Sequence, residues 1–412
     1  MSLQASLLGG SAGGSAGGSA GGSAGGSAGG SAGGSAGAVY GDAFATPLFA
    51  EALNRSRGAI IDLAERKPLW TLTERRNKEK AFLLWDPWVR SYLVAQELVS
   101  KVQFDVCWCE YEPPCDWQRA DAARPKELKV TANFFNDSTS SWLPGATVVR
   151  PPAGVFHAQL DHVLSWAELR EERAPEILTQ IDNQHSFWGQ IVPIQTDRLR
   201  HTRELIEAAI QFAVYVEMKF KHELACWRPA DYSSQVQPMI TTPGHGSTPS
   251  GHCTQSYVVV EILKALLGSM KSGPAFRSFN IQLGRMATRI ATNRVVAGVH
   301  FPVDNVAGRL LGVVLGEYFA YRCGGRGRDK DGGGVDPWRA GVFDGTKFPP
   351  HEDFEPYSQH LRPGATPRYY QFDIPKDHHG KPFEIGPAEP SVLTVLWDAA
   401  REECEELDLV FE

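Results

Sequence analysis

The segment His245–Gln255, HGSTPSGHCTQ, places two histidines seven residues apart around a Pro-Ser-Gly turn. A turn needs the proline, serine and glycine, but it needs neither histidine. The apolar run that follows predicts a helix over residues 252–268. Main-chain N–H groups at a helix N-terminus lack partners within the helix and suit an oxyanion; Ser250 would add a hydroxyl, and Gly251 would allow close approach. The alternative is that the serine only caps the helix and the histidine is incidental.

Three other segments have the apolar spacing of helices and are joined by short connections. Pro229 follows the first of them and Gly298 ends the second, as expected of residues that stop a helix. Four such helices favour a bundle, so we predict an all-α fold with a helical N-terminal extension. The three segments are residues 197–227, 275–298 and 302–322.

The remaining sequence is expected to surround this bundle. A Gly-Gly-Ser-Ala repeat near the start buries nothing and predicts a flexible leader. Helical spacing over residues 86–102 and 156–174 predicts helices, whereas residues 107–152 are rich in Pro, Asn, Ser and Asp and predict loops with short extended pieces. A polar tail ends in a predicted helix near residues 390–407. The predicted units are a leader (1–38), a helical N-terminal region (39–194), a core (195–322) and a C-terminal tail (323–412).

The overall composition excludes some partners. The net charge is −7 and there is no long basic run, so we expect no nucleic-acid partner. No apolar run reaches the roughly 18 to 20 residues needed to cross a bilayer, which predicts no membrane span. The opening MSLQASLL lacks a basic region, so a cytoplasmic or otherwise unexported protein is expected. The composition leaves homo-oligomer formation open.

The seven cysteines are an odd number, which argues against a complete disulfide framework. Cys107, Cys109 and Cys115 lie close together in the sequence. Their spacing is not that of the common zinc modules, and no fourth ligand is evident. Metal or disulfide chemistry at this cluster is therefore the less favoured interpretation.

Two cations mark the end of the first core helix. Lys221 and Arg228 are seven residues apart, about two helical turns, so they project from nearly the same face. The proline that follows Arg228 ends the helix. Taken alone, this pair is more simply interpreted as a solvated basic surface.

A third motif, NRVVAGVHFPVD, spans Asn293–Asp304. Arg294 is expected in the last turn of a helix, and His300 follows in the connection. Asp304 is four residues further on, where its carboxylate can accept from one ring nitrogen and fix the tautomer. The other ring nitrogen is then available to a metal or phosphorus centre. The alternative is a structural His–Asp pair next to an arginine that ends a helix.

In order along the chain, the three motifs read K-x6-RP, PSGH and R-x5-H-x3-D. This compound pattern resembles the superfamily of vanadium-dependent haloperoxidases, type 2 phosphatidic acid phosphatases (PAP2) and bacterial acid phosphatases. The resemblance covers residues 195–321 and implies the helical bundle of that superfamily. It departs from the usual phosphatase motif at Asn293, where those enzymes have serine.

The resemblance implies a role for each residue of the three motifs. Lys221, Arg228 and Arg294 would hold the oxygens of vanadate or phosphate, and the Ser250 hydroxyl and Gly251 amide would complete the cradle. His300 would be the axial vanadium ligand in a haloperoxidase, or the nucleophile in a phosphatase. Asp304 would orient His300, and His252 would be the acid–base group opposite it.

Details of the second motif favour the haloperoxidases. In algal bromoperoxidases a histidine precedes the motif histidine by seven positions, as His245 does here, and Thr-Gln follows it. The resemblance then implies vanadate as cofactor, no haem, and hydrogen peroxide, bromide or iodide, and a small organic acceptor as reactants. The x6 spacing between Lys221 and Arg228 instead matches fungal chloroperoxidases and phosphatases. A soluble acid phosphatase with a phosphohistidine intermediate and a non-catalytic oxyanion-binding module stay open as alternatives.

Overall fold

The computed structural model describes ten segments of the chain, which together contain all the predicted site residues. The predicted leader lies outside them, as do Cys109 and Cys115. The described segments are residues 47–60, 81–108, 128–136, 140–181, 184–194, 198–268, 273–324, 338–355, 369–374 and 391–410.

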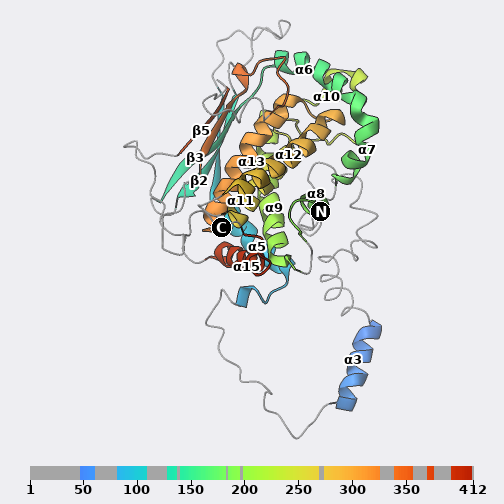
Figure 1. The fold of residues 1–412 in the computed structure, drawn as a ribbon, viewed down its shortest axis with the longest axis vertical. Coiled ribbons are helices and arrows are strands. Elements are labelled where there is room, and N and C mark those ends of the chain that lie inside the picture. Colours follow the sequence, from blue (N-terminus) through green and yellow to red (C-terminus); the bar gives the residue numbers. More distant parts are fainter. Residues whose placement is uncertain are drawn as a thin grey trace.

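Four long helices form the centre of the molecule (Figure 1), where the apolar spacing predicts them. The buried helix α11 packs against α9, α12 and α13. It is buried along almost its whole length, which explains why its sequence is apolar on every side rather than on one face. The four helices are α9 (Arg200–Leu224), α11 (Gly251–Leu267), α12 (Pro274–Val296) and α13 (Pro302–Arg322).

The prediction of an all-α fold is wrong, because a five-stranded mixed sheet packs on one side of these helices (Figure 1). Its strands lie in chain order, antiparallel except for the parallel pairing of β3 with β4. The parallel pair joins segments on either side of the helical core, so the sheet also includes part of the predicted tail. The strands are β1 (Val102–Trp108), β2 (Leu128–Asn136), β3 (Ser141–Val149), β4 (Ala340–Asp344) and β5 (Tyr370–Asp373).

Strands β2 and β3 lie within residues 107–152, where loops and short extended pieces were predicted, and β1 begins before that range. Pro144, which argued for a loop, lies opposite Asn133 at a register shift between β2 and β3, the kind of irregularity where a strand tolerates proline. Asn133 in turn donates to the Asp105 carboxylate at 2.7 Å. The turn-forming residues are thus accommodated by cross-strand pairing, which local composition does not reveal.

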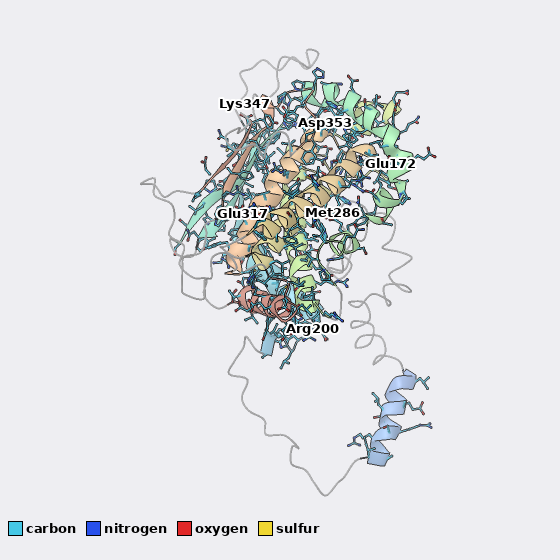
Figure 2. The ribbon with its side chains drawn as sticks, in the orientation of Figure 1. Glu172, Arg200, Met286, Glu317, Lys347 and Asp353 are labelled. Carbon is cyan, nitrogen blue, oxygen red and sulfur yellow. The ribbon has the colours of Figure 1, made fainter. Side chains whose placement is uncertain are left out.

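Aromatic packing joins the sheet to the helical core. Phe134 of β2 stacks on Tyr318 of α13 with ring centroids 4.0 Å apart, and Trp338 lies edge-on at 5.1 Å. A side chain at Gly145 of β3 would collide with the Phe134 ring, so glycine is needed there. The buried carboxylate of Glu317 lies at the same junction (Figure 2) and pairs with Arg339.

Shorter helices surround the core. The predicted helices near residues 86–102 and 390–407 are present with somewhat different ends, whereas the single helix predicted over 156–174 is divided into two helices joined by a 3-10 turn. The helix α7 packs against α12 and carries Glu172 on the outer surface (Figure 2). None of the helices in the described segments is long and apolar enough to span a bilayer. The remaining elements are α3 (Pro47–Ile60), α5 (Pro87–Val99), α6 (Ala153–Trp166), η3 (Ala167–Leu169), α7 (Arg170–Thr179), α8 (His185–Trp188), α10 (Pro229–Tyr232), η4 (Ser234–Val236), η5 (Gly345–Lys347) and α15 (Val392–Glu406).

Candidate functional site

Lys221 lies in the last turn of α9, which ends at Ala225 in a left-handed conformation. Its side chain is buried, and its ammonium donates to the backbone carbonyls of Gly246, Ser247 and Pro249. Three acceptors match the three protons of a lysine ammonium. Lys221 therefore holds the loop that leads into α11, and its positive charge lies directly beneath that loop.

Arg228 follows the end of α9 and is also buried. Its guanidinium donates to the carbonyl of Val299 at 2.7 Å and lies 3.1 Å from Nε2 of His300. On the other side, Nη2 lies 3.1 Å from Nδ1 of His245. One arginine thus contacts both of these histidines.

The second motif begins α11, with Ser250 at the N-cap position. The Ser250 side chain makes no capping hydrogen bond, and its buried Oγ has no hydrogen-bond partner. The serine therefore does not have the capping role that was the alternative to an anion site. A Cβ at Gly251 would lie 2.8 Å from the carboxylate of Glu217, so a larger residue there would force the Glu217 side chain to move.

Arg294 occupies the last turn of α12 and is almost completely buried. Its Nη2 donates to the carbonyl of Ile177 and to Oε1 of Gln180, both at 3.1 Å. Its Nε and Nη1 are buried without a hydrogen-bond partner. Buried guanidinium donors are costly to leave unpaired, so these two N–H groups indicate a missing acceptor.

His300 and Asp304 form a buried pair. Nδ1 of His300 lies 3.2 Å from Oδ2 of Asp304, and Nε2 faces Arg228. Because an arginine can only donate, Nε2 must carry the lone pair and Nδ1 the proton. Ser247, Thr248 and the Phe301 amide also donate to the Asp304 carboxylate.

His252 lies in the first turn of α11 and is buried. Its Nε2 is 3.1 Å from the carbonyl oxygen of Gln180, which can only accept. The proton of the neutral ring is therefore on Nε2, and the lone pair is on Nδ1.

Burial and positive neighbours control the protonation of this site. Burial, and then the cations around them, lowers the pKa of both His252 and His300 well below the usual range, so both rings are neutral near pH 7. Burial lowers the pKa of Arg294 to about 9 and that of Arg228 to about 10, which keeps both cationic at neutral pH. Burial also raises the pKa of Asp304, opposed by the hydrogen bonds from Ser247 and other donors.

The structure thus brings the three cations, both motif histidines and Asp304 to the facing ends of α9, α11, α12 and α13. The unpaired donors of Ser250 and Arg294 fit a tetrahedral oxyanion such as vanadate or phosphate, which accepts hydrogen bonds at every oxygen. Clusters of His, Cys, Asp and Glu suited to a metal cation are absent from the described residues, and Cys107 is an exposed free thiol. The unpaired N–H and O–H donors therefore suit an oxyanion.

Sequence reasoning missed several groups that complete the site. Gln180, which follows α7, contacts His252 through its carbonyl and Arg294 through its side chain. Thr248 binds Asp304, and the buried carboxylate of Glu217 lies against Gly251. Thr248 lies within the segment HGSTPSGH and could have been noticed there; the other two had no motif to mark them.

Comparison with known proteins gives three findings. A family model described as PAP2 superfamily matches residues 205–327. The vanadium-dependent bromoperoxidase of Ascophyllum nodosum is 29% identical over 94 residues, which cover 18% of this chain and 17% of that protein, so the match spans less than a fifth of the relative's length. A transmembrane PAP2-type phosphatidylglycerolphosphate phosphatase from Bacillus subtilis shares 20% identity, with coverage of 38% of this chain and 81% of that chain and a TM-score of 0.29.

The matched family segment begins in α9 and ends just after α13. It contains the Lys–Arg, Pro-Ser-Gly-His and Arg–His–Asp motifs and every residue that the sequence predicts for the site. Residues 205–327 of this chain are therefore a domain of the PAP2 superfamily.

Proposed function

We propose that the protein is a vanadium-dependent haloperoxidase, which oxidises bromide or iodide with hydrogen peroxide. The observation that carries the proposal is the pair of unpaired buried donors, Arg294 and Ser250, facing a site that also contains a neutral histidine oriented by Asp304. The histidine His245 beside Arg228 favours this function over the phosphatase alternative. The similarity to the Ascophyllum nodosum bromoperoxidase supports the same choice.

In this proposal the unpaired donors of Arg294 and Ser250, with the Gly251 amide, would hold vanadate oxygens, and Nε2 of His300 would be the vanadium ligand. Lys221 and Arg228 donate to backbone carbonyls and histidines in this structure and would turn toward the oxyanion when it binds. Bound vanadate would supply a centre that binds and polarises hydrogen peroxide for attack by halide, without haem. The positive charges of the cradle offset the negative charge of the oxyanion in a site that excludes water.

The protein's own residues then move the protons. The lone pair on Nδ1 of His252 accepts a proton from the incoming peroxide, because the lowered pKa of this histidine keeps its ring neutral beforehand. Asp304 keeps the proton of His300 on Nδ1, so the lone pair stays on Nε2. That lone pair accepts from Arg228 in this structure and would become a ligand once Arg228 turns to an oxyanion oxygen. A halide ion would approach on the side of Arg228 and His245 and leave as hypohalous acid, which would halogenate a small electron-rich organic acceptor.

The second candidate is an acid phosphatase, and the geometry of His300 is the observation that favours it. Nε2 is the atom that would attack phosphorus with its lone pair, once the guanidinium of Arg228, which donates to Nε2 in this structure, turns to the phosphate oxygens. His252 would then protonate the leaving oxygen. A third possibility, an oxyanion-binding module without turnover, requires the same donors.

One experiment separates the three. The purified protein is loaded with orthovanadate and assayed for halogenation of a phenol dye with bromide or iodide and hydrogen peroxide. A sample without vanadate is assayed for hydrolysis of p-nitrophenyl phosphate. We expect halogenation that depends on vanadate and is lost in His300→Ala; hydrolysis without vanadate would favour the phosphatase, and tight phosphate binding with neither activity would favour the binding module. Full halogenation by His300→Ala would contradict the assignment of the ligand.

A further inference from the structure

We infer that Glu217 is a positioning residue of the oxyanion cradle: it is the counter-ion of Lys221 while the site holds no oxyanion, and it takes up a proton when an oxyanion binds. This inference rests on the proposed cradle and concerns a carboxyl group to which the proposed reaction assigns no role.

The position of Glu217 places its charge against the cradle. It lies one helical turn before Lys221 on α9 and is completely buried. Its Oε1 is 2.8 Å from the position that a Cβ would take on Gly251, at the start of α11. Gln255, one turn further along α11, donates to the same oxygen at 3.2 Å. The carboxyl group is thus wedged between α9 and the main chain that would hold the oxyanion.

The hydrogen bonds around Glu217 do not fix it as a carboxylate. Its Oε2 is buried with no hydrogen-bond partner, and among the described residues the carboxylate makes no ion pair within 4.0 Å. The Lys221 ammonium donates instead to three backbone carbonyls. The attraction between Glu217 and Lys221 therefore acts through space, and nothing in the geometry prevents Oε2 from binding a proton.

The charges near Glu217 favour ionisation only while the site holds no oxyanion. Lys221 on its own helix and Arg228 beyond it are the cations that favour the carboxylate. The Cys253 thiol of α11 and the Asp304 carboxylate of α13 are the acidic groups nearby, and Asp304 acts on the same lysine. In the anion-free site the negative charge of ionised Glu217 partly balances the positive charges of Lys221 and Arg228, which lowers the free-energy cost of burying these charges.

An oxyanion reverses this preference. Its oxygens bind the same cations and place negative charge next to the Glu217 carboxylate, and like charges at short range in a buried site repel strongly. Burial raises the pKa of Glu217 and lowers the pKa of its neighbour Lys221, so negative charge added beside the pair shifts the carboxyl further toward its protonated form. The proton comes from solvent and forms an O–H bond at Oε2, which offsets one of the negative charges that the oxyanion brings.

Difference infrared spectroscopy with molybdate tests the inference without any turnover. Molybdate is a tetrahedral dianion that does not itself take up a proton near neutral pH. In mildly alkaline buffer, where Glu217 begins ionised, adding molybdate should produce the carbonyl stretch of a protonated carboxyl, shifted in D2O. The band should be lost in Glu217→Gln and kept in Glu207→Gln, a matched control on the same helix whose burial also raises the pKa of its carboxyl.

Calorimetry with molybdate on the same samples distinguishes an error in the proposed cradle from an error in the role of Glu217. If the wild-type protein does not bind molybdate, the proposed cradle fails. If it binds molybdate but shows no carboxyl band, or if the band persists in Glu217→Gln, the cradle stands and the role of Glu217 is wrong. If Glu217→Gln does not bind molybdate, Glu217→Asp is the second variant, because it retains a carboxyl group. Its carbonyl band should appear at a shifted frequency. A band at the wild-type frequency would contradict the inference.

Discussion

His300 and Asp304 are joined across the first turn of α13, with Nδ1 of the ring 3.2 Å from Oδ2 of the carboxylate. The carboxylate is itself held by Ser247, Thr248 and the Phe301 amide, so it cannot turn away from the ring. The imidazole is therefore fixed both in orientation and in tautomer, and its second nitrogen faces the guanidinium of Arg228.

Replacing this carboxylate should impair the site more than the fold of the core helices. In Asp304→Asn the amide no longer fixes the proton on Nδ1 of His300, so we expect vanadate affinity or vanadate-dependent activity to fall about 10- to 100-fold. Activity after titration with orthovanadate measures the effect. The exposed variant Asp373→Asn is the control, and equal activity of the two variants would remove the orienting role of Asp304.

Ser250→Ala should separate binding from stability. The Ser250 hydroxyl is buried and unpaired, so its removal should leave the free energy of unfolding almost unchanged in the absence of an oxyanion. The variant loses one hydrogen bond to a charged ligand, which predicts about 10- to 100-fold weaker molybdate or vanadate binding. Chemical denaturation and calorimetry measure the two quantities.

The control for that variant lies two turns along the same helix. Ser256 is also buried, but its hydroxyl is 3.4 Å from Oε1 of Gln184, away from the cradle. Ser256→Ala should bind oxyanion normally. A loss of stability in Ser250→Ala without any loss of affinity would mean that the hydroxyl is structural.

His245 should affect the halide step rather than vanadate retention. It contacts Arg228 at 3.1 Å but lies outside the set of residues that would hold the vanadate oxygens. In His245→Ala we expect the KM for bromide or iodide to rise about tenfold, comparable to losing one hydrogen bond to a charged group, with vanadate affinity little changed. Halide titrations at saturating vanadate measure this. His222→Ala, at an exposed position of α9, is the control, and an unchanged halide profile in His245→Ala would exclude a special role.

The buried neutral state of His252 predicts a dependence of stability on pH. The folded protein holds the pKa of His252 well below its usual range, whereas in the unfolded chain the ring protonates near pH 6.5. Above that pH both states are neutral and the histidine has no effect. As pH falls below it the unfolded chain binds the extra proton, so the free energy of unfolding should decrease by about 1.4 kcal/mol per pH unit until the folded-state pKa is reached.

Denaturant unfolding at a series of acidic pH values checks this dependence. His252→Gln cannot titrate, so its stability should decline less steeply than that of the wild-type protein. The exposed variant His222→Gln should follow the wild-type curve. Parallel curves for all three proteins would show that His252 is not the group responsible.

The helical core could be predicted from sequence because its signals are local. The apolar run of α11 and the proline at the start of α13 specify a helix without reference to the rest of the chain. The sheet could not be predicted in this way, because β3 pairs in parallel with β4, and the four core helices lie between these two strands in the sequence. Both strands pack against α13, where Gly341 of β4 lies against Leu310 and Val314, so the pairing depends on contacts between segments that are distant in the sequence.

Within the site too, residues with local sequence signals could be predicted, and residues placed by tertiary contacts could not. The cations and histidines occur at motif spacing and could be named from the sequence; their roles stay predictions. Gln180 and Glu217 could not be named, because their places in the site depend on tertiary contacts: Gln180 reaches His252 and Arg294 from the end of α7, and Glu217 lies against the start of α11. In the sequence, Asn293 stands out only because the phosphatase motif has serine at this position, and its structural contacts could not be predicted. Its amide donates to Gln180 and to Glu176, so the asparagine ties α12 to α7 and its end.

Gln180 is the residue outside the motifs with the widest influence on the site, and Gln180→Ala tests this. The change removes one acceptor of Arg294 and one of Asn293 but keeps the backbone carbonyl that faces His252. Arg294 keeps its bond to Ile177 and Asn293 keeps its bond to Glu176, but each loses one of its two acceptors. One buried N–H left unpaired on each should lower the free energy of unfolding by about 1 to 3 kcal/mol. A less fixed guanidinium should also weaken molybdate binding about tenfold, since a misplaced donor loses most of a charged hydrogen bond. Denaturation and calorimetry measure both, with the exposed Gln190→Ala as control. A loss of stability with unchanged affinity would make Gln180 a packing residue only, because Arg294 would then keep its orientation without it.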